Sequence, residues 1–85
     1  MREYVLDVIN KLVRAEKGNR VTEDSTFLDA GLDSFGYAIF FMGLDAEFNY
    51  FTVCGYGDDP FKEIPYSTLT VKEIIDKCIL GSTRT

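Results

Sequence analysis

Asp33 and Ser34 are the two residues whose types and placement allow chemistry at a single point of this chain. They follow Gly31 and stand directly before an apolar stretch that begins at Phe35. Aspartate and serine both accept hydrogen bonds from the unpaired amides of a first helical turn, so the pair predicts the start of a helix. A hydroxyl placed there sits on a stiff support, and the free amides and the helix dipole favour an attached negative charge. Taken alone, the pattern indicates only a helix cap.

Most catalytic constellations are excluded by the residues that the chain contains. There is no histidine, so neither a Ser-His-Asp nor a Cys-His arrangement can form. Cys54 and Cys78 are two ligands short of a closed zinc site unless carboxylates join them. No glycine-rich phosphate loop occurs, and Asp58-Asp59 before a proline is typical of a solvated turn. The sequence therefore predicts a protein that is not an enzyme and that holds no metal.

The stretch from Phe27 to Phe35, FLDAGLDSF, gives the serine a wider context. An aromatic residue stands seven positions before Ser34, Gly31 stands three before it, and Phe35 follows directly. This run resembles the prosthetic-group attachment signature of acyl and peptidyl carrier proteins. In that family an aromatic residue, a short acidic segment with glycine and Asp-Ser-Leu precede the second helix of a small bundle. The resemblance covers roughly residues 3–48 and 66–80.

The resemblance implies both a fold and a function. The expected fold is all-α, an up-down four-helix bundle of acyl-carrier type with three main helices and a short third one. Ser34 would carry 4'-phosphopantetheine, donated by coenzyme A, and the arm would hold acyl or related intermediates as thioesters. Asp33 matches the family acid that assists the metal-dependent transfer. The implied partners are a phosphopantetheinyl transferase and acyl-activating or acyl-transferring enzymes, and the cargo stays open.

The helix after Ser34 departs from the family pattern. Gly36 and Ile39 stand where acidic residues are common, and Phe35 replaces the usual leucine. With Met42, Phe35 and Ile39 form an apolar face in addition to the core face, and these three side chains are candidates for partner docking. We expect residues 49–60 to fold back and cover this face with aromatic side chains. The alternatives are a dedicated partner or a homodimer contact.

An unmodified interaction domain is the other function that the sequence allows. It would share the carrier fold and bind a protein through the apolar face of the second helix. Ser34 would then be only a cap.

Periodicity and turn residues predict the elements that position Ser34. Residues 3–16 form a helix with an apolar stripe, residues 19–33 form a long connection pinned by Val21, Phe27 and Leu32, and residues 34–48 form the second helix. The predicted core face of that helix comprises Tyr37, Phe40, Phe41, Leu44 and Phe48. Gly36 and Gly43, seven apart, share one side of it and favour close helix packing over a binding groove.

The second half of the chain is less regular. Residues 50–54 have strand-like composition, and a short helical turn is expected at 61–64. Thr70 and Glu73 form a capping box that predicts a last helix, ended by Gly81 and followed by a frayed tail to residue 85.

Composition and charge describe one small domain, residues 1–85, with a net charge of −5. Residues 21–63 hold nine acidic residues and one lysine, so the acidic charge is concentrated around Ser34 and favours basic protein partners over nucleic acid. The N-terminus is too charged for a signal peptide, and the longest apolar run, Phe35–Leu44, is far short of the ~20 residues that span a bilayer. We therefore expect a cytoplasmic protein with free thiols, outside the membrane and monomeric.

Overall fold

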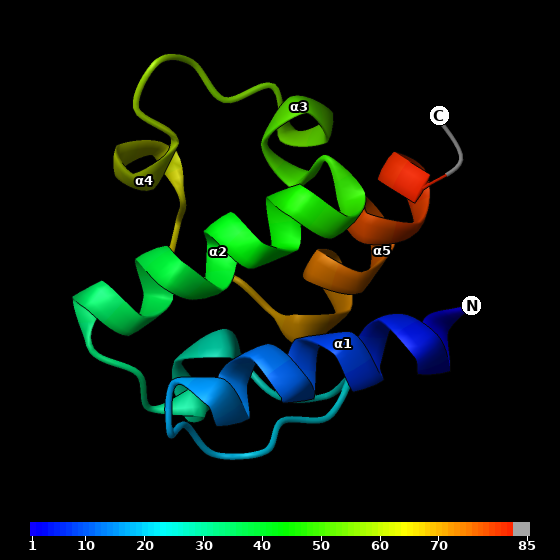
Figure 1. Cartoon of the computed structure of the whole chain (residues 1–85), viewed down its shortest axis with the longest axis vertical. Coiled ribbons are helices and arrows are strands. Elements are labelled where there is room, and N and C mark those ends of the chain that lie inside the picture. The colour runs from blue at the N-terminus through cyan, green and yellow to red at the C-terminus, as the bar shows by residue number, and fades with distance from the viewer. Residues whose placement is uncertain (83–85) are drawn as a thin grey trace.

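The fold is built from helices, as a computed structural model that describes residues 1–82 shows (Figure 1). Three long helices carry most of it: α1 (Arg2–Ala15), α2 (Ser34–Phe48) and α5 (Val71–Ser82). Three short elements complete it: the 3₁₀ turn η1 (Phe27–Ala30), α3 (Tyr50–Cys54) and α4 (Pro60–Glu63). Among residues 1–82 no strand forms, and one isolated antiparallel bridge joins Thr26 to Thr70. The all-α prediction is confirmed.

The core lies where the apolar stripes of the three long helices meet. On α2, all five residues of the predicted core face are buried. The stripes of α1 and α5 face them with branched aliphatic side chains and one thiol: Val5, Ile9, Val13, Val71, Ile74, Ile75 and Cys78. Phe27, from the connection, contributes a ring whose centroid is 4.6 Å from that of Phe40. Burial of this apolar surface is the main force that holds the helices together.

Gly43 lies where α2 packs on Leu12 of α1. A Cβ atom at this position would lie 2.9 Å from Leu12 Cδ2, so alanine would force the Leu12 side chain to shift. The prediction that the glycine side of α2 packs closely is confirmed here. At Gly36 the nearest atoms are Asp33 Oδ1 and Leu32 Cβ, both from the turn that precedes the helix.

The long connection between α1 and α2 is pinned as predicted. Val21 and Phe27 are buried and Leu32 is half-buried. The amide of Asn10 clamps the backbone of Val21 by donating to its carbonyl at 3.0 Å and accepting from its N–H at 2.9 Å. Further along, the N–H of Phe27 donates to the carbonyl of Leu69 at 2.9 Å, which ties the connection to the start of α5. These bonds explain how a stretch without periodicity keeps one path.

The segment after α2 differs from its prediction in two ways. Residues 50–54 form the helix α3 and not a strand, because Asn49 adopts a left-handed conformation (φ 55°) and turns the chain sharply. The side chain of Asp45 then accepts a hydrogen bond from the N–H of Phe51 at 2.9 Å and begins the new helix. The sharp turn directs Tyr50 into the core, where only 1% of it is exposed.

The expectation that residues 49–60 cover Phe35, Ile39 and Met42 is wrong. Phe35 remains 73% exposed and Met42 58% exposed. The aromatic side chains of the segment contact the core and each other instead: the Tyr50 ring centroid lies 5.5 Å from that of Phe41. Burial against a formed core removes more apolar surface from water than a lid over an exposed helix face.

The last helix begins as predicted and ends later. The N–H of Glu73 donates to Thr70 Oγ1 at 3.2 Å, which is the capping bond expected of the box. Gly81 does not end the helix, because α5 continues to Ser82, and the rest of the predicted tail, residues 83–85, lies outside the described residues.

The short helical turn predicted at 61–64 is the helix α4, which begins one residue earlier. None of the helices within residues 1–82 is both long and apolar enough to cross a bilayer.

Candidate site at the start of helix α2

Ser34 is the first residue of α2 and is exposed to solvent. Asp33 caps the helix: its Oδ1 accepts a hydrogen bond from the N–H of Gly36 at 2.6 Å, and its carbonyl accepts from Tyr37 at 2.9 Å. The first-turn amides of Ser34 and Phe35 have no partner among residues 1–82. The Ser34 hydroxyl therefore stands beside free backbone donors on a helix of 15 residues.

The turn before Ser34 is held by the core. Gly31 has φ 68°, the left-handed conformation that favours glycine, and its N–H donates to the carbonyl of Leu28 at 3.0 Å. From within α2, the Tyr37 hydroxyl donates to the carbonyls of Phe27 and Leu28, at 3.4 Å each. The Phe27 ring is fully buried. The predicted signature thus forms a stiff turn whose aromatic residue anchors it.

A pocket of about 420 Å³ opens directly beside Ser34. Its other walls are Tyr37 and Ala38 from α2, Phe61 from α4 and Tyr66 from the connection to α5. In Figure 1, α4 lies next to the N-terminal half of α2, which places these walls opposite each other. The Tyr66 ring centroid is 5.7 Å from that of Tyr37, in a tilted arrangement, and 5.9 Å from that of Phe41, in an edge-to-face arrangement, so contacting rings separate the pocket from the core. Burial, with the charge of Asp59, raises the pKa of the Tyr66 phenol and keeps it neutral.

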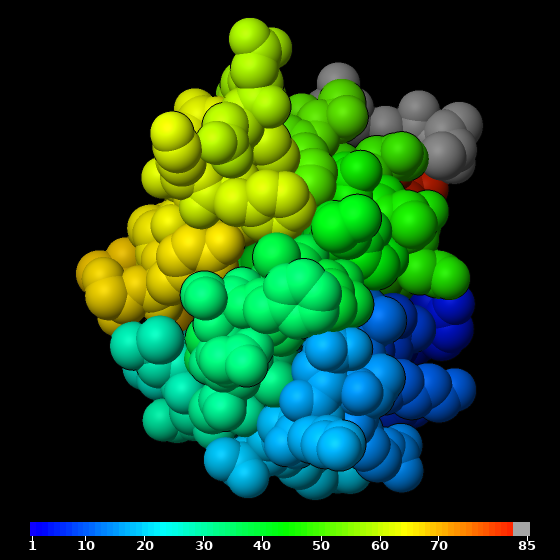
Figure 2. Space-filling view, turned by 60° about the vertical axis from the view of Figure 1, so that its left-hand side comes forward, coloured from blue at the N-terminus to red at the C-terminus, as the bar shows by residue number. Residues whose placement is uncertain are grey.

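The predicted docking residues share one exposed face of α2. Phe35 and Met42 project into solvent, and Ile39 between them is 37% exposed. In the space-filling view, the green surface of α2 lies between the yellow segment that contains α4 and the blue surface of α1 (Figure 2). Neither neighbour covers these three side chains, so the face is available for contact.

None of the four walls other than Ser34 was predicted as a site residue from the sequence. Tyr37 was assigned to the core, and Phe61 and Tyr66 lie more than 20 residues beyond Ser34. Pro60 at the first position of α4 was the available signal, because proline starts a short helix that can hold Phe61 against α2.

The cysteines and acids do not form a second centre. Within residues 1–82, no three side chains of the metal-binding types His, Cys, Asp and Glu gather at one point. Cys78 is fully buried, and burial raises the pKa of its thiol to about 12.

Comparison of the chain with models of protein families, with curated proteins and with solved structures found no match.

Proposed function

We propose that this chain is a carrier protein that holds acyl or related intermediates as thioesters on a 4'-phosphopantetheine arm attached to Ser34. The observation that carries the proposal is the placement of the Ser34 hydroxyl, exposed at the start of a rigid helix with a pocket of about 420 Å³ beside it. The proposal includes the finer fold assignment, an acyl-carrier-type bundle with α1, α2 and α5 as its main helices.

The residues around Ser34 fit the group. The free amides of Ser34 and Phe35, with the dipole of α2, favour a phosphodiester at this hydroxyl. Tyr37, Ala38 and Phe61 provide apolar walls for the part of the arm nearest to the protein. When bound, the arm supplies the thiol on which acyl groups are carried. In this proposal the chain presents the arm, and acyl-activating or acyl-transferring enzymes would perform the acyl transfer.

Asp33 has a role in this proposal besides capping. Only Oδ1 takes part in the bond to Gly36, and the residue is exposed. The second carboxylate oxygen therefore remains available to the metal ion of a phosphopantetheinyl transferase. One side chain can stabilise the helix and assist the transfer at the same time.

The experiment is transfer of the arm from coenzyme A by a broad-specificity phosphopantetheinyl transferase, read by intact mass. The wild type should gain one arm, and Ser34→Ala should gain none. Ser25→Ala and Ser67→Ala are matched controls, and both should be modified like the wild type. An unchanged mass of the wild type, under conditions that modify a known carrier, would overturn the proposal.

A second candidate function rests on the exposed face of α2. Phe35, Ile39 and Met42 together present an apolar surface that no part of residues 1–82 covers. An unmodified interaction domain would use this surface to bind a protein partner. A partner that binds wild type and Ser34→Ala equally, and loses binding to Met42→Lys, would favour this function if no arm is transferred.

A further inference from the structure

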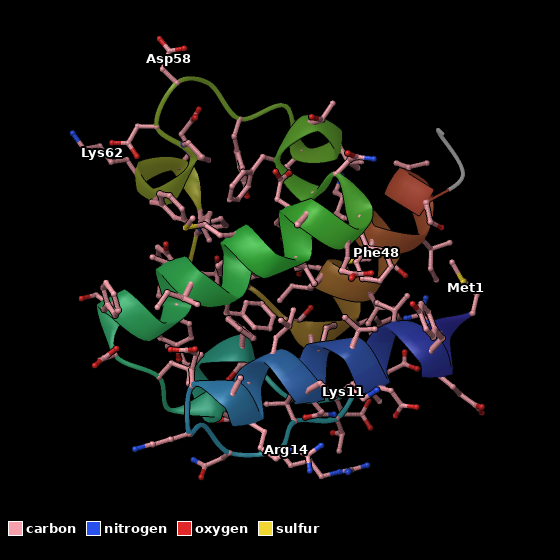
Figure 3. The ribbon with its side chains drawn as sticks, viewed as in Figure 1. Met1, Lys11, Arg14, Phe48, Asp58 and Lys62 are labelled. Atoms are coloured by element: carbon pink, nitrogen blue, oxygen red, sulfur yellow. The ribbon has the colours of Figure 1, made fainter. Side chains whose placement is uncertain are left out.

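The C-terminal end of α1 and the connection after it form a hollow of about 200 Å³. Asn10 and Arg14 line it from α1, and Gly18 and Arg20 line it from the connection. In Figure 3, Arg14 lies on the side of α1 that faces away from α2, beside the connection. This hollow is separate from Ser34 and its pocket.

The two walls of the hollow are held at a set separation. The two hydrogen bonds between the Asn10 side chain and the Val21 backbone fasten the connection to α1. The turn between the walls is tight: Lys17 has φ 63°, and the N–H of Gly18 donates to the carbonyl of Val13 at 2.9 Å. A Cβ atom on Gly18 would lie 2.5 Å from Leu32 Cδ2 and 2.7 Å from the carbonyl oxygen of Ala30, so only glycine fits at this point.

The two arginines of the hollow have no acidic partner. Arg2 pairs with Glu23 and Asp76, and Lys62 pairs with Asp59, but no carboxylate among residues 1–82 lies within 4.0 Å of the guanidinium of Arg14 or Arg20. The Cβ of the nearby Glu16 lies on the side that faces α2, 3.7 Å from where a Cβ on Gly36 would be. Arg14 and Arg20 therefore bring two unpaired guanidinium groups to one hollow of a chain whose net charge is −5.

We propose that this hollow binds a phosphate monoester group, held between the guanidinium groups of Arg14 and Arg20. Each guanidinium offers a planar fork of N–H donors that matches phosphate oxygens, and two positive charges balance the dianion. A volume of about 200 Å³ also leaves space beyond the phosphate for a small organic remainder. No aromatic ring lines the hollow, so a nucleobase has nothing to stack on, and a compact ester fits best. The site is independent of the proposed carrier function.

The test is a titration of the ¹⁵N-labelled full chain with glycerol 3-phosphate, followed by amide chemical shifts in phosphate-free buffer with 100 mM chloride. We expect saturable shifts at Arg14, Gly18, Arg20 and Val21. Arg14→Gln and Arg20→Gln should each weaken binding about tenfold, the loss expected when one charged hydrogen-bonding partner is removed. Arg14→Lys keeps the charge without the fork, and should also bind more weakly.

Lys11→Gln is the matched control, because Lys11 is an exposed cation on the same helix (Figure 3) and does not line the hollow. It should leave the affinity unchanged. Shifts that do not saturate, or an equal loss of affinity in Lys11→Gln, would show general charge attraction and overturn the proposal. A parallel titration with a phosphoserine peptide tests whether the phosphate group comes from a small ester or from a phosphorylated side chain. The ligand that binds more tightly, glycerol 3-phosphate or the peptide, identifies the source.

Discussion

At the scale of single residues, Asp33 connects the fold to the candidate site. Its Oδ1 caps α2 through Gly36, and capping requires only an acceptor oxygen, which an amide also provides. A role in metal-dependent transfer requires the negative charge of the carboxylate. Asp33→Ala removes both the acceptor oxygen and the charge, whereas Asp33→Asn removes only the charge. Comparing the two variants therefore separates capping from a role in the transfer.

Asp33→Ala should lower the free energy of unfolding by about 1 kcal/mol, because the first-turn amide of Gly36 loses its partner. Asp33→Asn should stay within a few tenths of a kcal/mol of the wild type, because asparagine caps a helix as well as aspartate does. Urea denaturation followed by circular dichroism measures both. If the carboxylate assists transfer, arm loading should be slow in both variants, and loading of Asp33→Asn at the wild-type rate would contradict that role.

At the scale of elements, the sequence predicted what depends on local pattern. The apolar stripes of α1, α2 and α5, the start of α2 with Asp33 or Ser34 as its cap, and the Thr70 capping box follow from residue types and spacing within one helix. The helix α3 and the pocket beside Ser34 depend on contacts between distant residues. Strand-like composition at 50–54 was overridden by the turn at Asn49 and by the burial of Tyr50, and the walls Phe61 and Tyr66 reach Ser34 only through tertiary packing.

Gly81 shows that tertiary packing can determine the role of a glycine that local pattern assigns to a helix end. Glycine near a helix end is typical of a stop signal, yet here α5 passes through it. A Cβ atom at Gly81 would lie 1.9 Å from the carbonyl oxygen of Phe48, so the glycine permits the end of α5 to contact the end of α2.

Gly81→Ala should therefore destabilise the protein even though alanine favours helices. The expected loss is about 1–3 kcal/mol, the usual cost of forcing extra atoms into a packed contact. The comparison is Gly57→Ala, at an exposed position where a Cβ would meet only Glu63 Oε2 at 3.5 Å. Its free energy of unfolding should change by less than about 0.5 kcal/mol. Equal stability of Gly81→Ala and the wild type in urea would refute the close contact between α5 and α2.

At the scale of the whole molecule, the helices separate three surfaces from one another. The pocket beside Ser34 lies between α2 and α4, and the exposed apolar face runs along α2. The hollow lined by Arg14 and Arg20 lies between α1 and the connection that follows it. The side of the molecule where α3 packs on α5 holds neutral phenol and thiol groups that lie in the core or against it. Burial raises the pKa of the Tyr50 phenol, and it raises those of Tyr56 and Cys78 to about 12 each.

This side of the molecule should set the alkaline limit of stability. A group whose pKa is higher in the folded than in the unfolded chain stabilises the folded protein fully below its unfolded pKa, and the stabilisation is lost as the pH rises toward the folded value. The unfolded values are 9.0 for a thiol and 10.0 for a phenol. The free energy of unfolding should therefore be level up to about pH 9 and fall between pH 9 and 12.

At pH 10.5 the loss through Cys78 alone should be about 2 kcal/mol, from 1.36 kcal/mol per pH unit above the unfolded pKa. Urea denaturation at pH 7.5 and 10.5 measures it. Cys78→Ala creates a small cavity and lowers stability at both pH values, but the difference between the two should shrink by that amount. Tyr4→Phe, at an exposed ring, should leave the difference unchanged. A wild-type free energy of unfolding that is the same at both pH values would mean that water reaches these groups and that α3 does not seal this side of the core.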